Sequence, residues 1–199
     1  KKNYKKYELG GNKKKYNSNK QKNEIKKYIR RNEETGADIC LVEIGGTIGD
    51  IESQPFLEAI RQFATDYGRE NCVFIHVTLV PYLAASDELK SKPTQHSVKE
   101  MLSIGIQPDI IVCRTEHPLS EDIKRKISLF CNVGPDCVIE NNNCDILYAV
   151  PMMLKEQKMD EVVLRKLGID APNQDLSDWE DMLFALRNPK QTVKIAMVG

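Results

Sequence analysis

Three acidic residues, Glu43, Asp50 and Glu52, surround a glycine-rich segment. Glu43 ends an apolar run typical of a strand buried on both faces of a parallel sheet, and such strand ends point toward the ligand crevice of α/β sheets. Glycines let the main chain approach an anion, and carboxylate oxygens beside a phosphate suit Mg²⁺. The segment therefore predicts a phosphate and magnesium site. In the alternative, Asp50 and Glu52 only cap the helix that begins at Pro55.

A second polar segment could bind a polyphosphate at the start of a predicted helix. It consists of Lys90, Ser91, Lys92, Pro93, Thr94 and Gln95. Lysine ammonium groups and free helix N–H groups attract phosphate, and Gln95 can donate and accept hydrogen bonds as base recognition requires. The alternative is a pair of solvated surface lysines. Lys126, on an otherwise amphipathic helix, is a weaker candidate of the same kind.

Several common sites are absent from the sequence. Gly45–Asp50 has glycines but no lysine, so it is not a Walker A loop, and no catalytic triad or Cys-His pair can be argued from spacing. The six cysteines lack zinc spacing and are predicted to be reduced thiols in a reducing compartment. No signal peptide or membrane-spanning run is present, which predicts a cytoplasmic protein without a membrane partner.

The elements that would position these residues alternate between strands and helices. Strands are predicted at 39–43, 73–80, 109–114 and 137–139. Helices are predicted at 23–35, from Pro55, from the Lys90–Gln95 segment to Gly105, and at 120–131, 145–156 and 160–167. This alternation predicts an α/β fold with a three-layer, mostly parallel sheet.

Charge is distributed unevenly along the 199 residues. Residues 1–31 carry thirteen bases and two acids, whereas the remainder has a net charge of −11. Alternating Lys, Asn and Tyr favour a disordered, low-complexity insertion at 1–22 over an arm that binds nucleic acid. We expect one domain at 23–170 and a linker at 171–192 containing a helix with a capping box at Ser177. The stretch 193–199 is expected to be the first strand of a second, truncated domain.

The longest motifs of the chain resemble the amidoligase domain of the CTP synthase family. The resemblance runs from about Asn23 to Gly199 and includes the segments Val42-Glu43-Ile44-Gly45-Gly46-Thr47-Ile48-Gly49-Asp50-Ile51-Glu52-Ser53, Pro55–Gln62, His76–Tyr82, Lys90–Glu100, Ser103–Asp109 and Phe130-Cys131-Asn132-Val133. It implies a P-loop-NTPase-like domain similar to dethiobiotin synthetase. It also implies a ligase of pyrimidine nucleotide synthesis: ATP phosphorylates O4 of UTP, and ammonia taken from glutamine displaces the phosphate to give CTP.

The resemblance also implies residue roles. Glu43 matches a Mg²⁺ ligand of the family, and Asp50, Ile51 and Glu52 match a segment that binds CTP during feedback inhibition. Lys90–Gln95 and Lys126 match contacts to UTP or CTP. Asn143 falls where the family contacts the adenine of ATP, although the family usually has Asp there.

Further implied features concern assembly. In the family a homotetramer completes the UTP site, and a glutaminase domain, which would begin near Val193, supplies ammonia. The family's P-loop and a second Mg²⁺ aspartate precede the residues present here. We therefore expect this stretch alone to be inactive. The alternatives are a nucleotide-binding regulatory or assembly module that has lost catalysis and a nucleic-acid binder that uses the Lys-rich start.

Overall fold

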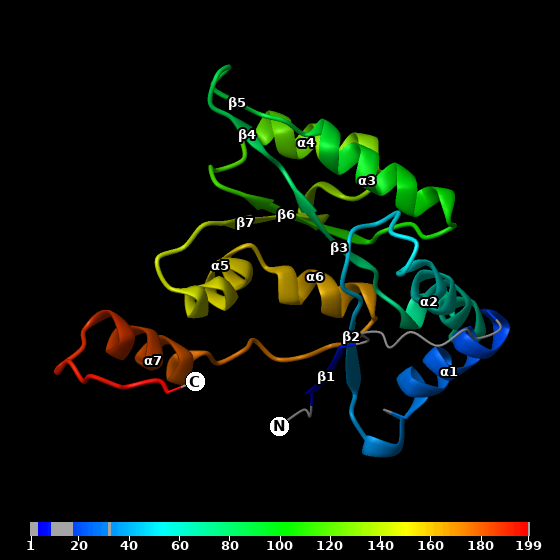
Figure 1. The fold of residues 1–199 in the computed structure, drawn as a ribbon, viewed down its shortest axis with the longest axis horizontal. Coiled ribbons are helices and arrows are strands. Elements are labelled where there is room, and N and C mark those ends of the chain that lie inside the picture. Colours follow the sequence, from blue (N-terminus) through cyan, green and yellow to red (C-terminus); the bar gives the residue numbers. More distant parts are fainter. Residues whose placement is uncertain (1–3, 9–17, 32, 199) are drawn as a thin grey trace.

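The computed structural model describes residues 4–8, 18–31 and 33–198 (Figure 1). The strands in this part of the chain are β1 Tyr4–Glu8, β2 Ile39–Glu43, β3 Ile75–Leu79, β4 Tyr82–Leu83, β5 Glu88–Leu89, β6 Ile110–Thr115 and β7 Val138–Asn142. The α-helices are α1 Ser18–Arg30, α2 Gln54–Tyr67, α3 Lys92–Ser103, α4 Glu121–Cys131, α5 Val150–Glu156, α6 Met159–Lys166 and α7 Ser177–Arg187. Short 3₁₀ turns lie at Glu33–Thr35, Arg69–Asn71, Pro135–Cys137 and Leu147–Ala149.

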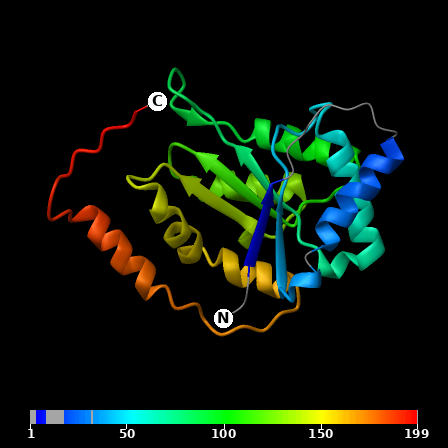
Figure 2. The same cartoon turned by 60° about the horizontal axis from the view of Figure 1, so that its bottom comes forward.

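Parallel strand pairing dominates the fold. The central sheet has the order β3-β6-β7, with both pairs parallel and Ile111 opposite Val138. A separate parallel pair joins β1 to β2, and β4 and β5 form a short antiparallel hairpin. Figure 2 shows the parallel strands pointing toward one edge, where the turn after β2, the β4-β5 hairpin and the loop after β7 all lie.

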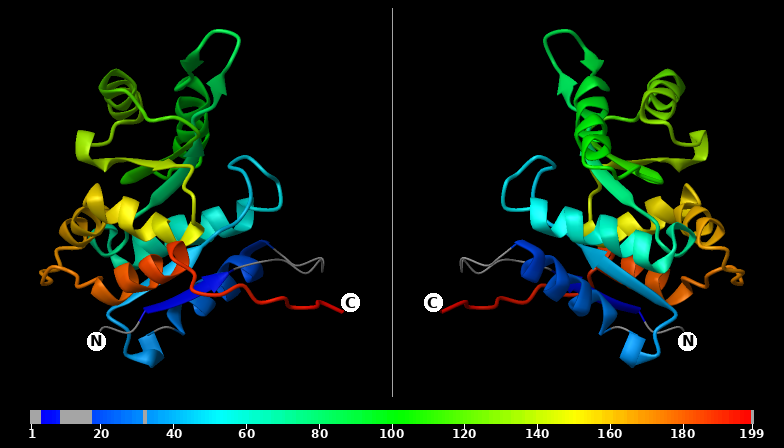
Figure 3. Two further views of the ribbon diagram at one scale, coloured as in Figure 1. Left: turned by 90° about the vertical axis from the view of Figure 1, so that its left-hand side faces the viewer. Right: turned by 90° about the vertical axis from the view of Figure 1, so that its right-hand side faces the viewer.

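Helices cover both faces of the central sheet (Figure 3). On one face, Ile111 and Cys113 of β6 pack with residues of α3 and α4. On the other face, Ile110 and Val112 pack with residues of α5 and α6. Successive residues of β6 therefore enter opposite cores, as the period of a strand requires. The prediction of a three-layer α/β fold is confirmed, and the arrangement is consistent with the P-loop-NTPase-like class.

Helix α2 joins the β2 region to the central sheet. Its Ala59 packs with Ile25 and Ile29 of α1 and with Val42 of β2. Its Leu57 belongs to another core cluster, which includes Met101 of α3 and reaches Ile106. Because α2 contributes to both clusters, apolar packing holds the turn after β2 beside the central sheet.

Two described parts of residues 1–22 have regular structure, which the sequence prediction did not assign. Tyr4–Glu8 forms β1, whose ladder with β2 is made by main-chain groups and needs no apolar pattern. Helix α1 begins at Ser18 and ends at Arg30, whereas the predicted helix was 23–35. The prediction of disorder for 1–3 and 9–17 lies outside the described residues.

Residues 193–198 have no regular secondary structure, and their assignment to the first strand of a further domain stays a prediction. Two other local predictions are wrong. Helix α7 has Leu176 as its N-cap, and Asp175 Oδ1, not a Ser177 capping box, accepts the Ser177 N–H. The predicted helix 145–156 begins only at Val150, because Leu147–Ala149 forms a 3₁₀ turn before Pro151. All six cysteines are free thiols, as predicted.

No helix among the described residues is long and apolar enough to cross a membrane.

Candidate functional site

The glycine turn, residues 44–53, connects Glu43 at the end of β2 to helix α2. Gly46 and Gly49 have φ values of +98° and +99°, a region that favours glycine. The Asp50 carboxylate accepts the Thr47 N–H at 3.0 Å, and a Cβ on Gly46 would come within 3.3 Å of the same carboxylate. Asp50 therefore organises the turn itself. It does not cap α2, since its recorded side-chain bond is to Thr47.

The other acids of this segment are presented to solvent. Glu43 is exposed, and a Cβ on Gly45 would make only an ordinary contact of 3.6 Å with its Oε1. Ile51 is 83% exposed and Glu52 is also exposed. Within the described residues, neither the Glu43 nor the Glu52 carboxylate makes a side-chain hydrogen bond or ion pair. Both carboxylates are thus available to a ligand, and Glu52 does not cap α2 either.

The second predicted segment forms the start of α3, with Ser91 as its N-cap and Pro93 in the first turn. Lys90 forms an ion pair with Glu88, and Lys92 is exposed without a recorded partner in the described part of the chain. The Gln95 amide donates to Ser91 Oγ at 3.1 Å. Lys92 and Gln95 are three residues apart and share one side of the first helical turn, with Lys92 exposed and Gln95 half-buried.

Thr94 differs from its neighbours in this segment because its side chain is fully buried. Its hydroxyl lies 3.0 Å from Thr78 Oγ1 and 3.2 Å from the carbonyl oxygen of Leu79. Both partners belong to β3. The structure thus gives Thr94 protein partners and no exposed surface, which differs from the predicted contact with UTP. Its spacing from Val98 and Met101 was the signal that could have placed it on the buried face of α3.

The remaining two candidate residues lie on other elements. Lys126 is on α4, and Asn143 follows directly after β7. Lys126 is exposed and, among the described residues, has no recorded partner. The Asn143 side-chain oxygen accepts a hydrogen bond from Arg114, which also donates to the Asn141 carbonyl at 3.0 Å. Arg114 at the end of β6 therefore holds the loop that carries Asn143. Sequence reasoning missed this role, although an arginine closing a buried strand was a visible signal.

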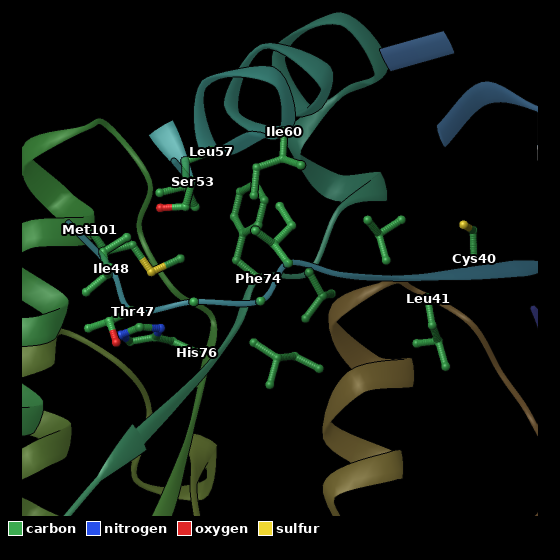
Figure 4. Close-up of a pocket in the computed structure, with 16 residues that line it drawn as sticks. Cys40, Leu41, Thr47, Ile48, Ser53, Leu57, Ile60, Phe74, His76 and Met101 are labelled. Atoms are coloured by element: carbon green, nitrogen blue, oxygen red, sulfur yellow. The ribbon is translucent and has the colours of Figure 1, made fainter. Parts of the chain in front are cut away.

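A cavity of about 230 Å³ lies beneath the glycine turn, bounded also by β2, β3, α2 and α3 (Figure 4). Its lining is mostly apolar, and in Figure 4 the side chains of Thr47 and His76 lie near each other at one end. His76 Nε2 is 2.8 Å from Ser97 Oγ, and burial lowers the pKa of the imidazole. An apolar cavity with a neutral imidazole does not suit a triphosphate. His76 is therefore a half-buried histidine with a protein partner.

The predicted site residues thus lie at one edge of the fold, but they do not line one common cavity. The glycine turn, the start of α3 and the loop after β7 lie at the carboxyl edge of the strands. The cavity is lined by residues of the turn but by none of Lys90–Gln95, Lys126 or Asn143. Within the described residues, no group of three His, Cys, Asp or Glu side chains could hold a metal ion by itself.

A comparison with known protein families decides the relationship of this chain. The family described as CTP synthase N-terminus matches residues 18–169. The chain belongs to this family.

Individual members of the family are highly similar to the chain. A CTP synthase of Geobacillus kaustophilus (strain HTA426) is 54% identical over 178 residues, which cover 89% of this chain and 34% of the relative. A CTP synthase of Ruminiclostridium cellulolyticum is 54% identical, and the match covers 89% of this chain and 33% of the relative. A CTP synthase of Desulfitobacterium hafniense (strain Y51) is 53% identical, and the match covers 89% of this chain and 34% of the relative. The chain spans about a third of the length of the curated relatives it matches.

Proposed function

We propose that this chain is part of the synthetase domain of a CTP synthase, a ligase that uses ATP to convert UTP into CTP with ammonia taken from glutamine. The main support is the family match over residues 18–169, which includes every candidate site residue. The exposed cationic start of α3 adds to this support, because it lies at the ligand-binding edge of a parallel sheet. In this proposal O4 of UTP is phosphorylated, and ammonia then displaces phosphate from C4.

Within this proposal, Lys90 and Lys92 neutralise the phosphates of UTP, and Gln95 contacts the base. Lys92 carries most of the charge, because Lys90 already faces Glu88. Lys126 contributes another cation from α4. Asp50, Ile51 and Glu52 form a CTP-binding segment for feedback inhibition, in which Asp50 also keeps the turn in shape. Asn143, positioned by Arg114, contacts the adenine of ATP.

The donor chemistry of the glycine turn fits a magnesium ion. Glu43 offers an exposed carboxylate beside Gly45, and Mg²⁺ commonly takes only one or two protein carboxylates, with phosphate oxygens and water as its other ligands. A single protein carboxylate is therefore sufficient on the protein side. Bound there, Mg²⁺ would neutralise phosphate charge during transfer.

The remaining parts of the proposal concern the whole protein. We propose a cytoplasmic homotetramer whose subunits complete the nucleotide site, with a glutaminase domain in the longer protein. The stretch 1–199 alone is then inactive, and ammonia-dependent CTP formation by this stretch would contradict that view. A regulatory module without catalysis is the alternative, and activity of the full-length protein distinguishes the two.

The decisive experiment compares Lys92→Ala with Lys99→Ala in the full-length protein. Both lysines are exposed on α3, but only Lys92 lies in the first turn. Loss of a charged hydrogen bond costs about 1.5–3 kcal/mol, so we expect Lys92→Ala to raise the KM for UTP roughly 10- to 100-fold. Lys99→Ala should leave the KM within about twofold. Equal UTP kinetics in wild type and Lys92→Ala would argue against the phosphate role.

A further inference from the structure

Helix α3 is attached to strand β3 by side-chain hydroxyl groups at its first turn. Thr78 and Thr94 are both buried, at 6% and 0% exposure, and their Oγ1 atoms lie 3.0 Å apart. The Leu79 carbonyl, 3.2 Å from Thr94 Oγ1, can only accept. Since a hydroxyl has one proton, Thr94 donates to Leu79 and Thr78 donates to Thr94. We call Thr78, Thr94 and the Leu79 carbonyl the threonine clamp.

Polar links attach both parts of the Lys90–Gln95 segment to the end of β3: the main-chain N–H of Lys90 donates to the Pro81 carbonyl at 3.0 Å, and the clamp holds the first turn of α3. Ser91 forms no side-chain capping bond to the helix, because its Oγ accepts from the Gln95 amide instead. One turn further on, Ser97 meets His76 of the same strand. Val98, the residue after Ser97, adds apolar packing of α3 against the core that β6 and α4 share. The clamp therefore sets the position of the first turn.

The clamp has a further polar neighbour, because the Cys113 thiol of β6 forms a weak side-chain hydrogen bond with Thr78. Cys113 of β6 packs in the same core, and burial raises the pKa of its thiol to about 12, so it is a neutral, weakly polar neighbour. A buried hydroxyl or carbonyl that loses its partner cannot turn to water and is costly to leave unsatisfied. Removal of the Thr94 hydroxyl should therefore displace or loosen the first turn of α3.

We infer that Thr94 is a positioning residue for nucleotide binding: it does not touch UTP but, with Thr78, fixes the direction in which Lys92 and Gln95 face the ligand. This inference rests on the proposed function. Thr94 and Lys92 are two residues apart, so they face nearly opposite sides of α3. A contact from Thr94 to a ligand on the outer side is geometrically excluded by its burial, whereas a shift of the helix start moves Lys92 and Gln95 directly.

The test uses Thr94→Val in the full-length protein, which keeps the branched shape and removes the hydroxyl. We expect the KM for UTP to rise about tenfold, with kcat within about twofold. Thr94→Ser keeps the hydroxyl and should restore most of the affinity. Thr65→Val is the matched control, because Thr65 on α2 is exposed and bonds only to the Arg61 carbonyl; it should leave the KM unchanged.

Two further measurements separate positioning from contact. In a background that carries both Lys92→Ala and Gln95→Ala, Thr94→Val should change the KM by less than about twofold, because its effect passes through these two side chains. Full multiplication of the two effects would instead mean that Thr94 touches UTP, and would overturn the inference. Hydrogen exchange of amides 94–97 should quicken in Thr94→Val and stay unchanged in Thr65→Val, with no substrate present.

The outcomes distinguish this inference from the proposed function. Faster exchange with no effect of Lys92→Ala on UTP would contradict the proposed UTP role and leave only the attachment of α3 supported. A raised KM in Lys92→Ala with an unchanged KM in Thr94→Val would overturn the positioning role of Thr94. Unchanged exchange in Thr94→Val would overturn the clamp itself.

Discussion

Single residues of one short segment have opposite roles in this fold. Lys92 and Thr94 are two positions apart, yet one is exposed and the other is fully buried with two hydrogen-bond partners. The difference follows from helix geometry, since two residues correspond to more than half a turn. A ligand-binding segment in this chain therefore contains side chains that can meet a ligand and side chains that hold the helix in place.

The glycine turn makes a similar distinction testable at Gly46 and Gly49. Their φ values are nearly equal, but only at Gly46 would a Cβ meet another group, the Asp50 carboxylate at 3.3 Å. Alanine at either position costs about 1–3 kcal/mol of backbone strain. We expect Gly46→Ala to cost about 1 kcal/mol more, because it also disturbs the Thr47–Asp50 hydrogen bond. Chemical denaturation of both variants measures the difference.

Gly168→Ala is the control for this pair, since its φ is +62° and nothing lies within 4 Å of its added Cβ. That conformation is the left-handed helical one, so its cost should be the lowest of the three. Equal costs at Gly46 and Gly49 would mean that the Asp50 carboxylate moves aside freely. The turn would then be less rigid than its hydrogen bond indicates.

At the scale of elements, the sequence predicted what a repeated pattern encodes. The apolar run at 109–114 forms the doubly buried β6, and the helix predicted from Pro55 is α2, which has Pro55 in its first turn. The sequence did not predict features that depend on contacts with residues far away in the chain. Tyr4–Glu8 becomes a strand only through β2, and the buried bonds of Thr94 exist only because β3 packs beneath α3. The sequence predicted that Glu43 ends a strand, but only the folded structure shows that its side chain is exposed.

Helix α2 offers a prediction on pH. Two hydrogen bonds from Arg61, and a further one from Gln62, lower the pKa of Glu58 from 4.5 to about 2. A carboxyl whose pKa is lowered by folding stabilises the folded state above the unfolded pKa and loses that contribution as pH falls toward the folded value. Glu58→Gln should therefore be less stable than the wild type at pH 7, and the difference should vanish between pH 4.5 and about 2.

The size of this effect is limited by solvent. The side chains of Arg61 and Glu58 are 37% and 35% exposed, so the pair contributes at most about 1 kcal/mol. Denaturation of full-length wild type and Glu58→Gln at several pH values measures it, with Glu156→Gln on α5 as the control at an exposed glutamate. A difference between wild type and Glu58→Gln that persists at pH 2 would show that packing, not ionisation, makes Glu58 stabilising.

At the scale of the whole molecule, two side-chain links hold α7 against the rest of the fold. Helix α7 follows an irregular segment and returns to the loop after β7 (Figure 1). Its Trp179 donates from Nε1 to the Tyr148 carbonyl at 2.8 Å, and Arg187 makes two hydrogen bonds of 3.1 Å to Asp145. Both links join α7 to the loop that begins at Asn143, so the attachment of α7 bears on the proposed adenine contact.

The two links should differ in strength. The Arg187–Asp145 pair is about half exposed on both sides, so solvent screening leaves it a weak contribution. Trp179 combines a half-buried indole, a hydrogen bond and a ring contact with Tyr148 at 6.3 Å, together about 2–3 kcal/mol.

In the full-length protein, Trp179→Ala should therefore speed hydrogen exchange in residues 177–187 and 145–149 strongly, while β6 and β7 stay protected. Asp145→Asn should have a small effect, and Trp179→Phe an intermediate one. Larger exchange in Asp145→Asn than in Trp179→Ala would mean that charge, rather than the indole, holds α7 in place.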